Sequence, residues 1–269
     1  LWYLGLISRS IFDTPTGPQE FAYIPDDLIP FIPEPEYGNH LSFGKPAPPM
    51  DTQLTLEAND RILDDACTYL AACRIGFVSP QEFFLLQYPS LAFIKSILSN
   101  AAILTPKGLP NAEATRKFLE NERQAALIHL AHTWLNSTIN DLAMVPNLIL
   151  EGQWKNDPLQ TRKSFIQLLN QIPEKTWWDI HSFIHAIYQN APNFQRPTGD
   201  FSSWYIKHAQ SGEYLSGIEH WFDVEGAYIE YLINGPLYWL GFLDLAKNQN
   251  SDKVTAFRVS RWFDDLLYN

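Results

Sequence analysis

The fold of this chain is indicated by the stretch Leu237-Tyr238-Trp239-Leu240-Gly241-Phe242-Leu243, because nearly the same seven residues occur at the other end of the chain. Residues 1–7 read Leu1-Trp2-Tyr3-Leu4-Gly5-Leu6-Ile7, with Leu, Leu and Gly at matching positions and aromatic or large apolar residues elsewhere. Each copy precedes strand-like segments and then an Asp-Asp pair before two large apolar residues. A supersecondary unit that recurs within one chain predicts tandem modules of a single fold.

Each copy is predicted to end a helix and to lead into a β-hairpin. Gly5 and Gly241 suit the left-handed position that closes a helix. The first copy is followed by two strand-like segments around the turn Thr14-Pro15-Thr16-Gly17-Pro18. The second is followed by residues 242–246 and 254–259, which have strand patterns and flank a polar loop. We therefore expect a helix followed by a hairpin at both ends.

Between these repeats the patterns are mainly helical. Apolar periodicity predicts helices over 60–74, from Ser79 and from Pro89, then a strand over 102–105 and one long helix over 112–135. Three helices followed by a strand is the order of a winged helix-turn-helix unit. The wing is degraded here, because residues 105–108 turn directly into the next helix.

Further helices are predicted towards the C-terminus. Asp157 caps a helix ending at Leu169, and Thr176 caps the next one. A later helix opens at Asp223 and restarts at Gly235-Pro236.

These patterns predict a mainly α-helical α+β chain of tandem winged-helix-like modules. Six prolines between residues 30 and 51 favour extended chain over helix in that segment. The expected parts are the end of an N-terminal winged-helix unit with its hairpin (1–29), a Pro-rich linker (30–51), a helical, degenerate winged-helix-like unit (52–145), and a C-terminal winged-helix-like domain with a helical insertion (146–269). Because Leu1 falls inside a helical pattern, we expect the chain to be part of a longer polypeptide.

Composition narrows the classes of function. The 269 residues carry 19 Lys and Arg against 30 Asp and Glu, a formal net charge of -11, whereas general nucleic-acid binders are usually basic. No apolar run predicts a transmembrane helix and no segment resembles a signal peptide. The two cysteines, Cys67 and Cys73, lie too far apart on one predicted helix for a disulfide. We expect a cytoplasmic protein that has no contact with a membrane.

The sequence resembles winged-helix proteins, and more narrowly the helicase-associated winged-helix family found beside transcription-repair helicases, together with uncharacterised bacterial proteins built from such modules. The resemblance is carried by the two Leu-aromatic-aromatic-Leu-Gly segments, Phe21-Ala22-Tyr23-Ile24-Pro25, Thr105-Pro106-Lys107-Gly108, Glu151-Gly152-Gln153-Trp154-Lys155-Asn156-Asp157-Pro158 and Val224-Glu225-Gly226-Ala227. It implies a DNA-associated or protein-interaction role and offers no catalytic residue to carry over.

The two repeated helices lack the side chains for reading DNA, and the third helix of the middle unit carries one cation, Lys95. Base readout needs outward Arg, Lys, Asn, Gln or Ser on the third helix, and neither repeated heptad contains a basic residue. The candidate nucleic-acid residues are instead the cations of the C-terminal hairpin, Lys247, Lys253, Arg258 and Arg261. The alternative interpretation is an ordinary solvated hairpin with charged strand edges.

A candidate metal pair is also present. His181 and His185 are four residues apart on a predicted helix and so share one face. Ser182 stands where a zinc-protease motif has Glu, and the spacing marks no third ligand, which favours partly buried or capping histidines. We find no phosphate-binding loop, dinucleotide motif, nucleophile elbow or paired-cysteine zinc motif. We therefore expect no enzyme activity and no cofactor.

The function expected from the sequence is an interaction scaffold of tandem winged-helix modules inside a larger DNA-transaction or regulatory protein. Its partners would be another protein or other domains of the same polypeptide. The first alternative is a DNA-binding transcriptional regulator that uses the C-terminal hairpin, which the net charge does not favour. The remote alternative is a metal-dependent enzyme at His181 and His185.

Overall fold

The computed structural model describes residues 7–14, 17–25, 28, 43–76, 91–152, 154, 156–197 and 199–268. The chain divides into two compact units, Leu1–Leu41 and Ser42–Asn269. In the described part of the chain, no helix combines the length and the apolar character needed to cross a membrane.

The first unit contains the predicted N-terminal hairpin. Strands β1 (Ser8–Thr14) and β2 (Gly17–Tyr23) pair antiparallel in the register Ser8↔Tyr23 to Thr14↔Gly17. Gly17 has a φ of 108°, a conformation at the turn that a side chain would strain. Residues 1–6 of the first repeated heptad and residues 30–42 of the predicted linker lie outside the described residues.

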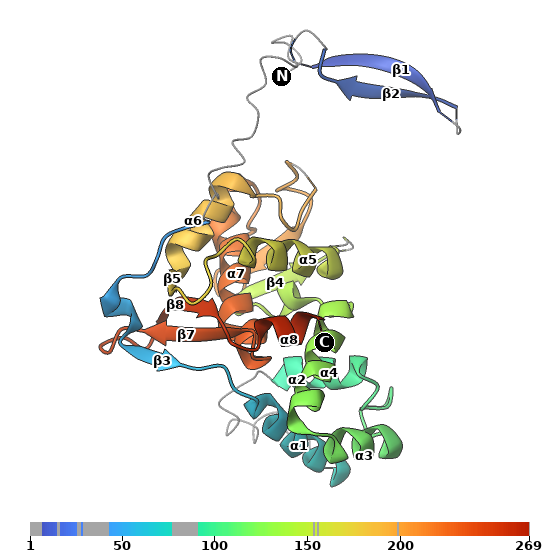
Figure 1. The fold of residues 1–269 in the computed structure, drawn as a ribbon. Helices are drawn as coiled ribbons and strands as arrows, with labels where there is room; N and C mark the ends of the chain where they lie inside the picture. Colours follow the sequence, from blue (N-terminus) through green and yellow to red (C-terminus); the bar gives the residue numbers. More distant parts are fainter. Residues whose placement is uncertain are drawn as a thin grey trace. The chain divides into compact units, whose positions relative to one another are not determined.

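The second unit combines helices with two small antiparallel sheets, so the chain is an α+β protein as predicted (Figure 1). The larger sheet has the order β3-β7-β8-β5, and the smaller sheet pairs β4 with β6. The strands are β3 (Leu54–Leu56), β4 (Leu148–Glu151), β5 (Trp178–Asp179), β6 (Tyr205–His208), β7 (Leu243–Lys247) and β8 (Val254–Val259). The α-helices are α1 (Arg61–Arg74), α2 (Leu91–Asn100), α3 (Ala112–Glu120), α4 (Arg123–Asn136), α5 (Pro158–Leu169), α6 (Ile180–Asn190), α7 (Ala227–Leu232) and α8 (Phe263–Tyr268).

The second copy of the repeat closes a helix, as its sequence predicts. α7 belongs to a helical segment over residues 221–239, in which two π-helical turns flank the α-helical part. Gly241 has a φ of 85°, and the Phe242 N–H donates to the Leu237 carbonyl at 2.8 Å, so the chain leaves the helix and enters β7. Leu237, Leu240 and Phe242 are fully buried. The heptad is therefore a core element.

Two strands of the larger sheet were not predicted. β3 pairs with the outer edge of β7 from Leu54↔Lys247 to Leu56↔Leu245. β5 pairs with β8 at Trp178↔Phe257, which corrects the prediction that Thr176 caps a helix. Asp179 is the cap instead, because its carboxylate accepts from the Ser182 N–H at 2.6 Å.

Two other predictions in the middle of the chain are wrong. Residues 102–105 form a turn closed by a single bridge between Leu104 and Pro110, and no strand. The predicted helix over 112–135 is broken into α3 and α4, with extended backbone at Asn121 and Glu122. The break lets Arg123 start α4 against α1, where it pairs with Asp60 at 2.6 Å. The helix predicted from Ser79 lies outside the described residues.

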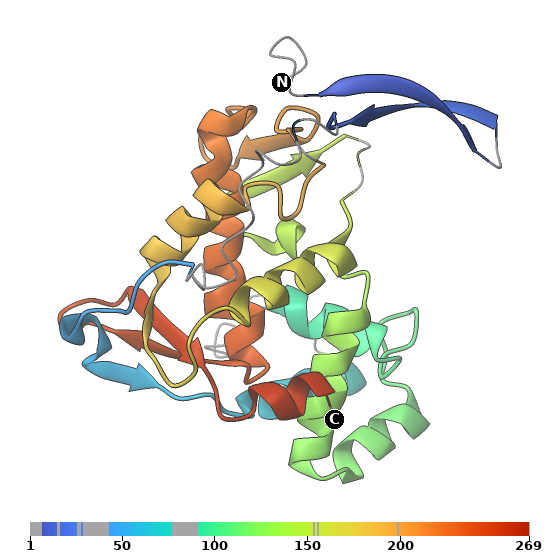
Figure 2. The same ribbon diagram turned by 45° about the horizontal axis from the view of Figure 1, so that its top comes forward.

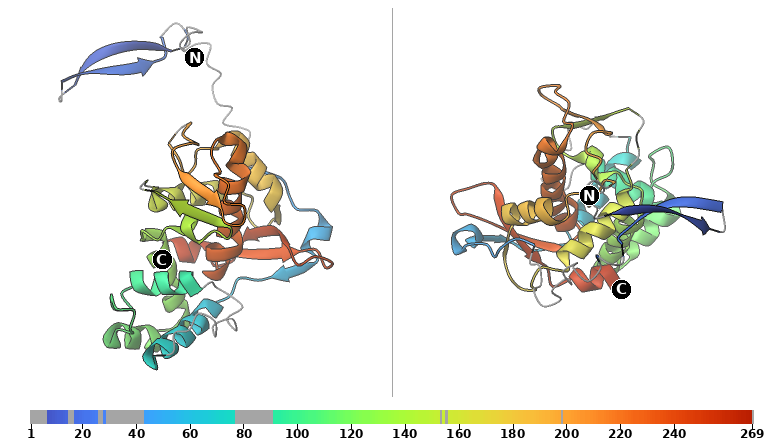
Figure 3. Two further views of the ribbon diagram at one scale, coloured as in Figure 1. Left: turned by 180° about the vertical axis from the view of Figure 1, so that it is seen from behind. Right: turned by 90° about the horizontal axis from the view of Figure 1, so that it is seen from above.

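Helix α4 ties the second unit together. It packs against α1, α2, α5 and α8 (Figure 2). One hydrophobic core runs from Phe43 to Leu266, so the regions predicted as 52–145 and 146–269 share it. β4 and β6 lie side by side at the end of this unit opposite to α1 and α3 (Figure 3).

Candidate functional site

Two of the predicted cations flank the loop at the tip of the β7–β8 hairpin, and both are ion-paired. The Lys247 ammonium lies 3.4 Å from Asp252 in the same loop. The Lys253 ammonium lies 3.1 Å from Glu230, which comes from α7. The hairpin is also fastened to the segment before β3, since the Gln249 N–H donates to the Gln53 side chain. The contacts of Lys253 and Gln249 join the hairpin to α7 and to the segment before β3.

Arg258 lies on β8 and has a carboxylate partner on the neighbouring strand. Its Nε donates to Asp244 on β7 at 2.7 Å, and its guanidinium lies 4.5 Å from the centre of the Trp177 ring. The other oxygen of Asp244 accepts from the Ala58 N–H at 2.7 Å. Asp244 is only 6% exposed, so this pair links β7, β8 and the chain after β3.

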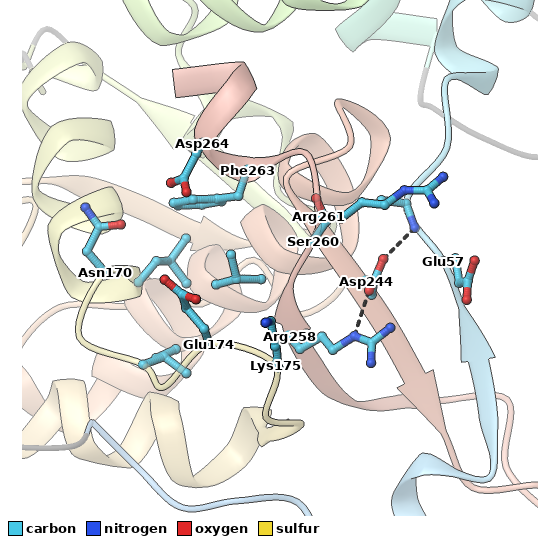
Figure 4. Close-up of a pocket in the computed structure, with 14 residues that line it drawn as sticks. Glu57, Asn170, Glu174, Lys175, Asp244, Arg258, Ser260, Arg261, Phe263 and Asp264 are labelled. Carbon is cyan, nitrogen blue, oxygen red and sulfur yellow. Dashed lines mark hydrogen bonds and ion pairs between the residues drawn. The ribbon is translucent and has the colours of Figure 1, made fainter. Parts of the chain in front are cut away.

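Arg258 and Arg261 line one pocket with a volume of about 710 Å³. Figure 4 shows it between the end of α5, the first turn of α8 and the β7–β8 hairpin. Arg261 is exposed and its guanidinium lies 5.2 Å from the centre of the Trp262 ring. Lys247 and Lys253 are not among the lining residues. The structure therefore brings together two of the four predicted cations.

The pocket has mixed charge. Its lining includes three cations, Lys175, Arg258 and Arg261, and four acids, Glu57, Glu174, Asp244 and Asp264. Since Asp244 and Arg258 neutralise each other, the remaining charges are two positive and three negative. Such a surface suits side chains of both signs from a protein partner better than a run of phosphates. Sequence reasoning missed Glu174 and Lys175, because they come from a loop far from the hairpin in the chain.

The predicted histidine pair is formed on α6. The Nε2 atoms of His181 and His185 are 3.1 Å apart, so one imidazole donates to the other. The His185 ring also lies 4.7 Å from the ring of Phe222, which holds it against the helical segment 221–239. In the described part of the chain, no group of three His, Cys, Asp or Glu residues could hold a metal ion.

The helical segment 221–239 precedes the β7–β8 hairpin in the chain and contacts both α6 and β7. Most of its residues are buried, including Trp221, Ile229 and Ile233 at 0% exposure. The exposed positions are Phe222 and Asp223, and no Lys or Arg occurs in the segment. This helix therefore has no cation to present to nucleic acid.

Trp154 and Glu225, from the segments Glu151–Pro158 and Val224–Ala227, are linked through Trp204 and Arg196. The Trp154 ring stacks on Trp204 with centroids 4.6 Å apart, and the Arg196 guanidinium lies 4.3 Å from the Trp204 ring. Arg196 donates in turn to buried Glu225. Burial raises the pKa of Glu225, while Arg196 opposes the rise. Trp204, Arg196 and Glu225 are buried and Trp154 is partly buried, so these contacts belong to the packing of the unit.

No known protein family matches this chain, and no curated protein or solved structure is significantly similar to it.

Proposed function

We propose that this chain is a non-enzymatic interaction scaffold of tandem winged-helix-like modules within a larger DNA-transaction or regulatory protein. The order of elements supports the winged-helix assignment. α5, α6 and the helical segment 221–239 are followed by the β7–β8 hairpin, which gives three helices and then a wing. Residues 191–220 separate the second helix from the third and carry β6, consistent with an insertion in this module.

The observation that carries the proposal is the burial of the third helix. A winged helix that reads DNA places this helix in the major groove and needs outward donors and acceptors on it. Here its exposed residues are Phe222 and Asp223, and its Glu230 is already paired with Lys253. An acidic, aromatic surface favours contact with protein, because aromatic residues are enriched in protein interfaces.

Duplex binding by the chain tests the proposal. We expect no measurable fluorescence-anisotropy change for labelled mixed-sequence duplexes at about 150 mM salt, where non-specific binding is already weak. A basic DNA-binding protein of similar size, titrated in parallel, shows that the duplexes are competent. Nanomolar binding that depends on sequence would overturn the scaffold proposal.

One observation favours the DNA-binding alternative. Lys175 and Arg261 line one pocket beside the hairpin together with Arg258, which is paired with Asp244, and the two remaining cations could contact phosphates. The expected signature is binding that weakens steeply with salt and is lost when Arg261 and Lys175 are neutralised.

A further inference from the structure

The two histidines on α6 place a pair of metal-binding nitrogens at the separation that one metal ion requires. The Nε2 atoms of His181 and His185 are 3.1 Å apart. Zinc binds imidazole nitrogen at about 2.0–2.1 Å, so an ion at equal distance from both atoms would form an N–Zn–N angle of about 100°. This angle lies between those of square-planar and tetrahedral coordination, about 90° and 109°. The separation therefore matches that of a two-histidine chelate.

The packing of α6 fixes the backbone that carries the pair and the ring of one histidine. The helix buries Phe183 and Ile187 completely, so its orientation in the second unit is set by the core. The His185 ring lies 4.7 Å from the Phe222 ring, and the Tyr188 ring lies 4.8 Å from the same ring. A ligand side chain that is already held in position loses less conformational entropy when it binds.

The pair is accessible from solvent, as a site for an incoming ion must be. His181 is exposed and His185 is half-buried. In the described part of the chain, the protein partner of each imidazole is the Nε2 atom of the other. Metal-binding histidines usually donate their second N–H to a protein group, which strengthens binding by about 10–100-fold. No protein group gives this support to either Nδ1 atom among the described residues, so we expect modest affinity.

The charge and the donor atoms restrict the class of ligand. Asp179 caps α6, and its carboxylate offsets the positive end of the helix dipole near His181. The formal net charge of -11 favours the approach of cations. Imidazole nitrogen suits zinc, copper and nickel, whereas magnesium and calcium prefer oxygen ligands. The ligand that fits the pair is therefore a divalent ion of a late transition metal.

The number of protein ligands sets the kind of site. Structural zinc sites have four protein ligands and catalytic ones have three. Among the described residues, no third His, Cys, Asp or Glu joins the pair, so water fills the remaining positions. Half of the ligands of a structural zinc site should supply about half of its binding free energy, which corresponds to a Kd of about 1–200 µM.

We propose that His181 and His185 together bind one divalent late-transition-metal ion through their Nε2 atoms. The ion replaces the hydrogen bond between the rings. The imidazole that donated through Nε2 then carries its proton on Nδ1, so that both Nε2 lone pairs face the metal. This inference is independent of the scaffold function, because neither histidine lines the pocket of mixed charge.

Titration of the full ¹⁵N-labelled chain with zinc chloride tests the site. The imidazole nitrogen resonances are recorded in long-range ¹H–¹⁵N spectra, and His181→Gln and His185→Gln identify the two residues. We expect both Nε2 resonances to shift and to saturate at one ion per chain, with both rings in the Nδ1–H form. Each single variant loses one of two ligands and should bind zinc about tenfold more weakly or worse. His129→Gln, which replaces an exposed histidine on α4, is the matched control and should bind zinc unchanged.

The outcomes separate this inference from the proposed function. Nε2 resonances that do not move at about 1 mM zinc overturn the metal site. The same follows if His185→Gln, folded as judged by its tryptophan indole resonances, binds zinc as tightly as His129→Gln does. Magnesium chloride at the same concentration should leave the resonances in place, and an equal response to both ions would also contradict the proposal. Sequence-selective DNA binding would overturn the scaffold function and leave the zinc titration unaffected.

Discussion

Replacing Arg162 by Met should cost more stability than any exposed substitution in this chain. Arg162 on α5 donates to Asp141 at 2.8 Å, and both side chains are fully buried. It also donates to the carbonyls of Ser137 and Ile139, which follow α4. Asp141 accepts a further bond from the Trp134 indole at 3.0 Å. The ion pair therefore links the end of α4 to α5 inside the hydrophobic core that residues 52–145 and 146–269 share.

The loss in the free energy of unfolding is large because Arg162→Met leaves the Asp141 carboxylate buried without its ion-pair partner. Removing one partner of a buried ion pair strands the other charge, at a cost of about 3–5 kcal/mol. Burial already raises the pKa of Asp141, and Arg162 is the strongest influence that opposes the rise. Without Arg162, the pKa of Asp141 rises further above its unfolded value. The folded variant then holds the proton more tightly than the unfolded chain, so its stability falls as pH rises between the two pKa values, by at most about 1.4 kcal/mol per pH unit.

Urea denaturation followed by tryptophan fluorescence measures this loss at pH 5 and pH 7. We expect a deficit of about 3–5 kcal/mol at pH 7 and a smaller one at pH 5. The double variant Arg162→Met with Asp141→Leu has no stranded charge and should recover most of the loss. Arg123→Met, which breaks an exposed pair, should cost about 1 kcal/mol or less. A deficit below about 1 kcal/mol at pH 7, or an equal deficit at both pH values, would refute this reasoning.

Three further predictions use other parts of the structure. Gly241→Ala forces a side chain onto a φ of 85° and should cost about 1–2 kcal/mol, whereas an unchanged melting temperature would contradict the helix-ending role. Arg123→Gln should raise the pKa of Asp60, which the hydrogen bond from Arg123 holds below its ordinary value, and NMR titration of the carboxyl checks this. The variants Lys247→Gln, Lys253→Gln and Arg258→Gln neutralise three paired cations, and any residual duplex binding should keep its dependence on salt in each of them. A slope of log K against log salt that is smaller by about 0.9 per neutralised cation would show phosphate contacts and contradict this expectation.

The parts of the fold that follow from local chemistry could be predicted from the sequence. The turn residues between β1 and β2 and the helix-ending Gly241 each specify backbone geometry within a few residues. β3 and β5 could not be found in this way, because strands of three and two residues exist only through pairing with distant β7 and β8. The break between α3 and α4 is likewise set by a distant contact, that of Arg123 with α1.

The candidate site likewise contains residues that the sequence could indicate and residues that only the tertiary fold brings there. Arg258 and Arg261 could be singled out because both come from one hairpin and its exit. Their acidic neighbours could not, since Glu57 and Glu174 come from loops that only the tertiary fold brings to the pocket.

Two observations argue against DNA reading, the ion pairs of the hairpin cations and the burial of the third helix, and the second is the stronger. Exposed ion pairs contribute about 0–1 kcal/mol each, so phosphates could draw Lys253 away from Glu230 at little cost. The paired cations alone would therefore not prevent DNA binding. The third helix is different, because Trp221, Ile229 and Ile233 are fully buried in the shared core. Each buried apolar side chain contributes about 1.5–3 kcal/mol, and turning this helix towards a groove would expose several at once. The burial of the helix therefore argues against major-groove reading more strongly than the ion pairs of the hairpin do.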